Sequence, residues 1–141
     1  MGMGRVWNGL VTGVLLLLPG VALAGGGPAN VMVLFNADDP EAEVVAAYYA
    51  AARDLMPGHT CAVDGVAPDA RTLDFADYRT TVHAALDGCL AALPQPEEID
   101  YLVLVRGLPY RVDIPDGYSS SLSAMLQVHH AVSTADGTEL A

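Results

Sequence analysis

The sequence predicts an α/β fold of three layers, in which helices cover both faces of a doubly wound, mostly parallel sheet that is itself incomplete. Two nearly continuous apolar runs, residues 31–35 and 99–105, are typical of strands buried on both faces. Between them the chain carries a first helix, a weaker strand at 60–66 and a second helix. This alternation of strands and helices is the pattern of a parallel sheet with right-handed connections.

Residues 1–24 have the pattern of a secretory signal peptide. Arg5 precedes an apolar stretch, and Ala22-Leu23-Ala24 offers small residues at a cleavage point. The apolar stretch reaches about 15 residues, fewer than the roughly 20 that cross a bilayer as a helix. We therefore expect an exported protein, periplasmic or extracellular, without stable membrane insertion after cleavage; the alternative is an uncleaved anchor. Residues 25–29 are then a flexible leader, and 30–141 a single α/β domain.

The first predicted strand leads directly into a helix. Asp39 is a good N-cap, and Pro40 suits the first helical position. We expect this helix to run to about Met56, before Pro57 and Gly58. Its apolar positions recur at three- and four-residue spacing and predict one buried stripe, comprising Val45, Tyr48, Tyr49, Ala52, Leu55 and Met56.

The second predicted helix starts at the capping arrangement of residues 74–77 and ends before Pro94. Arg79, His83 and Asp87 share a face that we expect to be solvated. The opposite face is apolar and comprises Phe75, Tyr78, Val82, Ala85, Leu86, Cys89, Leu90 and Leu93.

The next strand, residues 99–105, is nearly all apolar, and we expect it to be central and parallel. Ser119 to Ser121 then favour the cap of a third helix, and Asp136-Gly137 a turn. Three strands make an unusually small sheet of this type. We therefore expect the chain to be the N-terminal part of a larger protein, or a partner to complete the sheet. The apolar positions of the third helix are Leu122, Met125, Leu126 and Val132.

The formal net charge of −11 excludes some partners. An acidic surface repels phosphate backbones, so we expect no nucleic-acid binding. Cationic ligands or divalent metal ions are compatible with the acidic charge, and its simplest use is solubility. The partners that we consider for the chain are a small polar ligand or another protein.

Polar side chains follow the two apolar strands where the carboxyl ends of a parallel sheet form a crevice. Carboxylates and guanidinium groups at one edge can bind a polar ligand, because the guanidinium fork fits a carboxylate. The alternative is that Asp39 only caps its helix, Asp38 is solvated and Arg106 pairs with one of them. The candidate ligand-binding residues are Asn36, Asp38, Asp39, Arg106 and Arg111.

Other kinds of site find no support in the sequence. The loop after the first strand lacks the glycine spacing of a dinucleotide site, and Arg106 stands where a receiver-type magnesium site needs a carboxylate. His129 and His130 are neighbours, which on a helix point in different directions. The serines form no nucleophile elbow. We expect no metal and no cofactor, and the sequence assigns no catalytic residue.

Cys61 and Cys89 are the only two cysteines, and export would allow them to form a disulfide. Cys61 opens the second strand and Cys89 lies near the end of the second helix, so both are expected at the same edge of the sheet. The alternative is that each is an unpaired apolar residue of its own element.

Three blocks of sequence carry a family resemblance: residues 33–40, residues 47–49 with Arg53 and Tyr78, and residues 101–112, the last a strand running into Gly107-Leu108-Pro109-Tyr110-Arg111. On these blocks the chain resembles a family of exported bacterial proteins of unknown function, over roughly residues 30 to 126. The resemblance implies export, the α/β fold and a longer full-length protein. It implies no catalytic assignment, and where the family tends to have Ser-x-Asp this chain has Ser119 to Ser123 without the acid.

Two functional hypotheses follow. The first is an exported α/β protein of unknown function with a polar-ligand crevice, hydrolase-like when completed by further chain. The second is a noncatalytic interaction module of the cell envelope or secretome. A nonfunctional fragment is a third reading. Whether the chain is an enzyme therefore stays open at this point.

Overall fold

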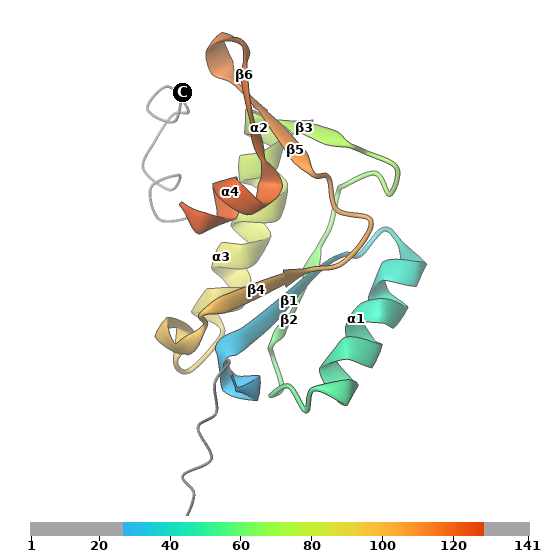
Figure 1. The fold of residues 1–141 in the computed structure, drawn as a ribbon, viewed down its shortest axis with the longest axis vertical. Coiled ribbons are helices and arrows are strands. Elements are labelled where there is room, and N and C mark those ends of the chain that lie inside the picture. The colour runs from blue at the N-terminus through green and yellow to red at the C-terminus, as the bar shows by residue number, and fades with distance from the viewer. Residues whose placement is uncertain (1–26, 129–141) are drawn as a thin grey trace, which may run out of the picture.

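The structure is a computed structural model that describes residues 27–128. Three strands, β1 (Val31–Asn36), β2 (Thr60–Val63) and β4 (Tyr101–Leu104), form a parallel sheet in the order β2-β1-β4 (Figure 1). The predicted signal peptide, the first two residues of the predicted leader, Val132, His129, His130 and the Asp136-Gly137 turn lie outside the described residues.

A second small sheet stands beside the first. It contains β3 (Thr72–Asp74), β5 (Arg111–Ile114) and β6 (Tyr118–Ser121), in the order β3-β5-β6. β3 runs parallel to β5, and β5 pairs with β6 as an antiparallel hairpin. The single, mostly parallel sheet predicted from the sequence is therefore wrong in part: the described chain has an α/β arrangement of two small sheets, one of them parallel.

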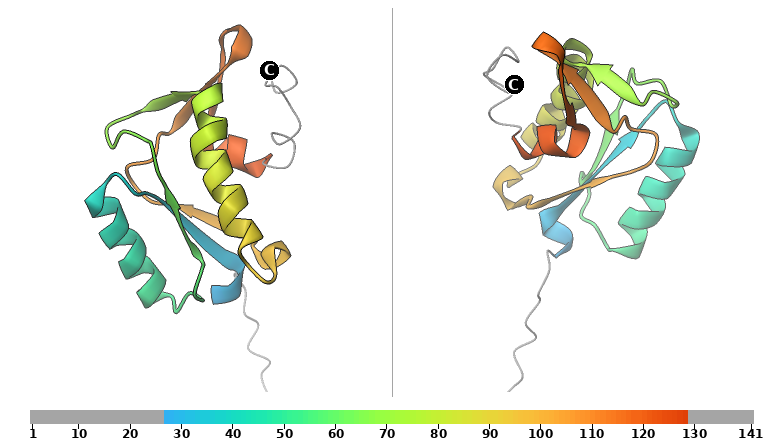
Figure 2. Two further views of the ribbon diagram at one scale, coloured as in Figure 1. Left: turned by 180° about the vertical axis from the view of Figure 1, so that it is seen from behind. Right: turned by 45° about the horizontal axis from the view of Figure 1, so that its top comes forward.

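Helices lie on both faces of the parallel sheet (Figure 2). α1 (Pro40–Ala52) covers one face. The other face is covered by a continuous helical rod built from α2 (Phe75–Tyr78), the π-helical segment η2 (Arg79–His83) and α3 (Ala84–Ala91), together with α4 (Leu122–Gln127). Short 3-10 turns are η1 (Pro28–Asn30), η3 (Pro96–Glu98) and η4 (Pro115–Gly117).

The apolar core has two parts, one on each face of this sheet. The smaller part lies under α1 and contains Val33, Ala42, Ala46 and Val105. The larger part joins the sheet to α3, α4 and the second sheet, with Met32, Leu34 and Tyr78 among its fully buried side chains. Cys61 and Cys89 are joined by a disulfide within this part, with their Cα atoms 5.8 Å apart. The bridge ties β2 to α3.

The buried face of α1 differs from the predicted stripe. Ala42 and Ala46 are buried, whereas Tyr48 is 75% exposed and Val45 42% exposed. Tyr49 and Leu55 are half-buried, and Ala52 and Met56 are exposed. Small alanines let the helix lie close to the sheet, so the larger side chains of the periodic pattern turn outward. The helix also ends at Ala52 rather than near Met56.

The sequence pattern predicts His83 on a solvated face of the second helix, and this is wrong. The His83 side chain is buried, and the residue is only 5% exposed. Its Nδ1 lies 3.1 Å from a carboxylate oxygen of Asp87, and its ring meets the edge of Tyr78. The π-helical segment at residues 79–83 explains the difference. A π-turn inserts one extra residue into the helix and rotates the following side chains around the axis relative to the regular pattern.

β4 is not the central strand. Within the described residues it has β1 on one side and no strand on the other, and Leu102, Val103 and Leu104 are only half-buried. β1 is central, with Met32 and Val33 fully buried. The aliphatic run at 99–105 is apolar enough for a central strand, but the described chain supplies only one neighbour.

Two further sequence expectations concern the ends of helices. Asp39 and Asp74 cap α1 and α2, their side chains accepting from Glu41 N and Asp77 N. Ser121 caps α4, as its hydroxyl accepts from the N–H of Ala124.

None of the described helices is long and apolar enough to cross a membrane.

Candidate functional site

Asn36 is the last residue of β1 and is completely buried. Its Nδ2 donates to the carbonyl oxygen of Val66 at 2.9 Å and to that of Gly107 at 2.8 Å. Its Oδ1 accepts from the N–H of Asp38 at 2.9 Å. One side-chain amide therefore joins the three loops that follow β1, β2 and β4, and both of its polar atoms are engaged in the fold.

Asp38 and Asp39 also bind their own chain. A carboxylate oxygen of Asp38 accepts from the N–H of Gly65 at 2.8 Å, which holds the loop after β2 against the loop after β1. Asp39 is buried and accepts from Glu41 N at 3.0 Å as the N-cap of α1. The second Asp39 oxygen faces Gly107, where an added Cβ would lie 2.7 Å away. A glycine at this position lets the two loops come together.

Arg106 pairs with a residue that the sequence did not single out. Its Nη1 binds a carboxylate oxygen of Glu41 in the first turn of α1, and both side chains are largely exposed. The sequence alternative paired Arg106 with Asp38 or Asp39, and that is not the contact found. An exposed pair of this kind is screened by water and contributes little to stability.

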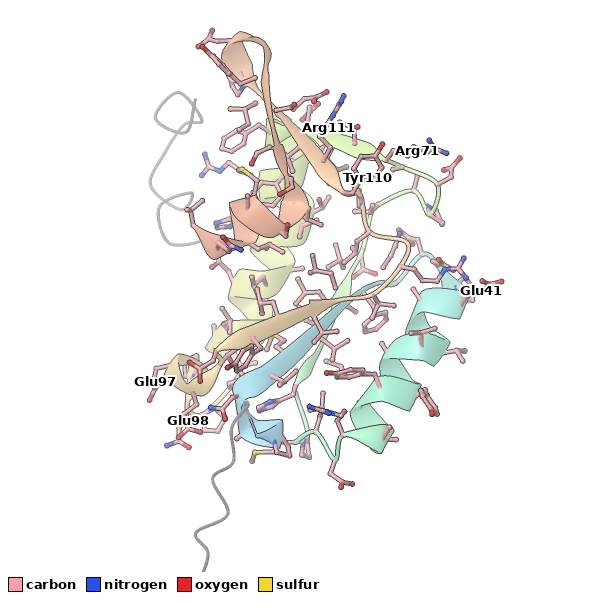
Figure 3. All side chains as sticks on the ribbon, in the orientation of Figure 1. Glu41, Arg71, Glu97, Glu98, Tyr110 and Arg111 are labelled. Carbon is pink, nitrogen blue, oxygen red and sulfur yellow. A yellow bond between two sulfur atoms is a disulfide. The ribbon has the colours of Figure 1, made fainter. Side chains whose placement is uncertain are left out.

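Arg111 lies apart from the other candidate residues. It is on β5 in the second sheet, where its Nε pairs with Asp113 at 3.1 Å. Figure 3 shows Arg111 beside Tyr110 and Arg71, well away from Glu41 at the start of α1. The backbone N–H groups of Tyr110 and Arg111 both donate to the carbonyl of Arg71. The expected meeting of Arg111 with the carboxylates of the β1 loop therefore does not occur.

The cavity next to Arg106 is small, and polar and apolar groups line it in similar measure. It has a volume of about 240 Å³ and lies where β4 passes into the loop before β5. None of Asn36, Asp38 and Asp39 lines it. Its lining residues are Leu104, Val105, Arg106, Leu108, Pro109, Tyr110, Leu122 and Ser123. Of the five candidate residues, this cavity therefore has only Arg106 in its wall.

The partners of the polar side chains were not found from the sequence. Glu41 looks like a helix-dipole residue, and Gly65, Val66 and Gly107 act through backbone atoms that any residue carries. The one signal in the sequence is that residues 65 and 107 are glycines. Both have a positive φ, which glycine adopts more readily than other residues.

Two observations on the described part of the chain concern metal ligands and titratable groups. It contains no group of three His, Cys, Asp or Glu side chains that could hold a metal ion. Burial raises the pKa of Tyr78 to about 12, and the nearby negative charge of Asp87 adds to the effect. Tyr78 belongs to the core and not to the carboxyl edge of the sheet.

Comparison with known proteins gives no relative. No protein-family model, no curated protein and no solved structure matches the chain.

Proposed function

We propose that the chain is an exported, noncatalytic domain that acts by binding another protein. The observation that carries this proposal is that all five candidate ligand residues already bind groups of the same chain. A polar site that acts on a small ligand needs side-chain atoms free to reach it. Here the side chains of Asn36, Asp38 and Asp39 hold loops and a helix end. The two arginines, Arg106 and Arg111, pair with acidic side chains at the surface. The second of the two functional hypotheses is therefore favoured over the crevice.

The outer face of α1 is the surface that suits a protein partner. Val44 is 69% exposed, Tyr48 lies one turn further along, and Val45 borders them. Residues four apart share one face of a helix, so Val44 and Tyr48 form a continuous apolar strip. Tyrosine is one of the residues enriched at protein interfaces. Figure 1 places α1 as an outer layer, with its inner side on the sheet.

The charge around this strip indicates the kind of partner. Glu43 is exposed next to Val44, and the chain as a whole carries −11. The complementary surface is an apolar patch of a protein bordered by basic residues, because opposite charges at the rim speed and orient association. An anionic lipid surface is repelled by the same charge.

The proposal includes export and the wider fold. The predicted signal at residues 1–24 and the resemblance to an exported family support export, and a disulfide between Cys61 and Cys89 suits an oxidising compartment. The parallel order β2-β1-β4 with helices on both faces supports a doubly wound sheet as the finer description of the fold. N-terminal sequencing of the secreted or periplasmic product tests export, and Gly25 is the expected first residue.

Site-specific photo-crosslinking tests the interface. A photoreactive phenylalanine analogue replaces Tyr48 in the exporting cell, and the matched control places it at Tyr118, which is also exposed, at 58%, but on β6. We expect a discrete adduct from position 48 only, and its loss when Val44→Asp is added. Val44→Asp itself should leave the thermal midpoint unchanged, because the side chain is in water. Equal adducts at both positions, or an adduct that survives Val44→Asp, would refute the interface.

A further inference from the structure

Three of the five arginines in residues 27–128 lie on two neighbouring segments, and the sequence has no lysine. Arg71 directly precedes β3, and Arg106 and Arg111 lie on either side of Tyr110, which is 64% exposed. Figure 3 shows Arg71, Tyr110 and Arg111 side by side at the edge where β3 and β5 begin. Tyrosine and arginine are among the residues that contribute most to binding at protein interfaces.

Backbone hydrogen bonds fix the positions from which these three side chains project. The carbonyl oxygen of Arg71 accepts from the N–H of Tyr110 at 3.2 Å and from the N–H of Arg111 at 3.3 Å. The carbonyl oxygen of Tyr110 accepts from the N–H of Leu122 at 3.0 Å, which joins the same junction to the start of α4. A surface that is already ordered loses little conformational freedom on binding, and this favours affinity.

The guanidinium groups of Arg71 and Arg111 are accessible from solvent. Arg71 is exposed and has no ion-pair partner among residues 27–128. Arg111 pairs with Asp113 through Nε, and both side chains of this pair are half-exposed. Because such an exposed pair contributes little to stability, a carboxylate of a partner can take the place of Asp113.

A cavity of about 240 Å³ opens beside Tyr110. Tyr110 shares its wall with Leu104, Leu108 and Leu122, which are buried or half-buried, and with Arg106. The leucines offer an apolar surface to one side chain of a partner. An apolar group in the cavity and a carboxylate at the arginines are therefore the two groups that fit this surface.

We propose that Arg71, Tyr110 and Arg111, with the cavity beside Tyr110, form an interface for an acidic segment of another protein. A guanidinium group binds the carboxylate of an aspartate or glutamate through two parallel hydrogen bonds. An apolar neighbour of that acidic residue enters the cavity. A nucleic acid fits less well, because the net charge of −11 repels its many phosphates far more than it repels one or two carboxylates.

Titration with two matched synthetic peptides, followed by NMR on the whole chain, tests this proposal. The acidic probe is the acetylated, amidated peptide Gly-Glu-Leu-Asp-Gly, and in the control peptide glutamine and asparagine replace its two acidic residues. We expect the acidic probe to shift the backbone amide signals of Tyr110, Arg111 and Leu122 saturably, and the control peptide to leave them in place.

A matched pair of variants tests the role of Arg71. Arg71→Gln should weaken binding of the acidic probe about fivefold, which is the upper end of what an exposed ion pair contributes. The thermal midpoint should stay unchanged, because the side chain is exposed. Arg53→Gln makes the same change of charge at an exposed arginine at the end of α1 and should leave binding unchanged.

Three outcomes would overturn the proposal. The absence of a saturable shift with the acidic probe at millimolar concentration would show that the surface does not bind carboxylates. Equal shifts with both peptides would show that charge plays no part. An equal loss of affinity in Arg71→Gln and Arg53→Gln would show a general effect of net charge. Val44→Asp should not change peptide binding, so this interface and the proposed α1 interface can fail separately.

Discussion

Replacing Asn36 is the sharpest test of the idea that the carboxyl edge of the sheet serves the fold. Asn36→Leu keeps the volume of the side chain and removes all three of its hydrogen bonds, to Val66 O, Gly107 O and Asp38 N. A buried hydrogen bond contributes roughly 1 kcal/mol net, and a buried group left without a partner costs more. The expected loss in the free energy of unfolding is therefore about 3 kcal/mol or more.

Asn36→Asp is the companion variant. It keeps an oxygen for the N–H of Asp38 but turns a carboxylate oxygen toward the carbonyl oxygens of Val66 and Gly107, where the native amide donates. Burial and like partial charges oppose ionisation of this new carboxyl group and raise its pKa. The variant should be least stable at neutral pH and regain stability as the pH falls, because protonation restores a donor.

Urea unfolding followed by circular dichroism measures both variants with the disulfide intact. Asp38→Ala is the comparison, since it removes a single, solvent-exposed contact to Gly65, and its expected loss is about 1 kcal/mol. If Asn36→Leu costs under about 1 kcal/mol, Asn36 does not hold the loops together and its polar atoms are free for another use.

The remaining predictions concern the backbone, the disulfide and the core. Gly107→Ala should destabilise the fold by about 1–3 kcal/mol, because φ is +89° and the new Cβ would lie 2.7 Å from an oxygen of the α1 N-cap; Gly88→Ala in α3, with nothing within 4 Å, should instead stabilise it by about 0.5–1 kcal/mol, and thermal unfolding of the pair checks both signs. Reduction of Cys61–Cys89, 28 residues apart, should cost about 3–4 kcal/mol, and two thiols that react in denaturant without a reductant would show that the bridge is absent. The contribution of Tyr78 to stability should be constant below pH 10 and be lost as the pH rises from 10 toward 12, because the unfolded chain ionises Tyr78 first; a Tyr78→Phe variant should lose this part of the pH dependence in urea unfolding.

Much of the parallel sheet could be predicted from the sequence, because β1 and β4 lie in long apolar runs and the helices beside the sheet begin at strong caps. Asp39 and Asp74 cap the helices expected of them. The second sheet could not be predicted in the same way. β3 has three residues and β6 reads Tyr-Ser-Ser-Ser, so neither carries a strong apolar signal. Their pairing depends on β5, whose alternating burial is visible only once its neighbours are placed.

The candidate site was the weaker part of the prediction for a related reason. Residue type placed Asn36, Asp38 and Asp39 at one edge, and they do lie at the end of β1 and in the loop directly after it. What each side chain binds depends on backbone atoms of Gly65, Val66 and Gly107, which no sequence pattern displays. The three- and four-residue spacing of apolar residues predicted the wrong buried face of α1 for a similar reason. The close approach of Ala42 and Ala46 to the sheet decided which face is buried.

An NMR titration of the carboxyl edge tests the central claim most directly. Magnesium chloride, calcium chloride and sodium succinate are added to millimolar concentration while the amide signals of Asp38, Gly65 and Gly107 and the side-chain amide of Asn36 are followed. The account predicts that these signals stay in place, since their hydrogen bonds are internal to the fold. Saturable shifts that vanish in both Asp38→Ala and Arg106→Ala would contradict it and restore the polar-ligand crevice.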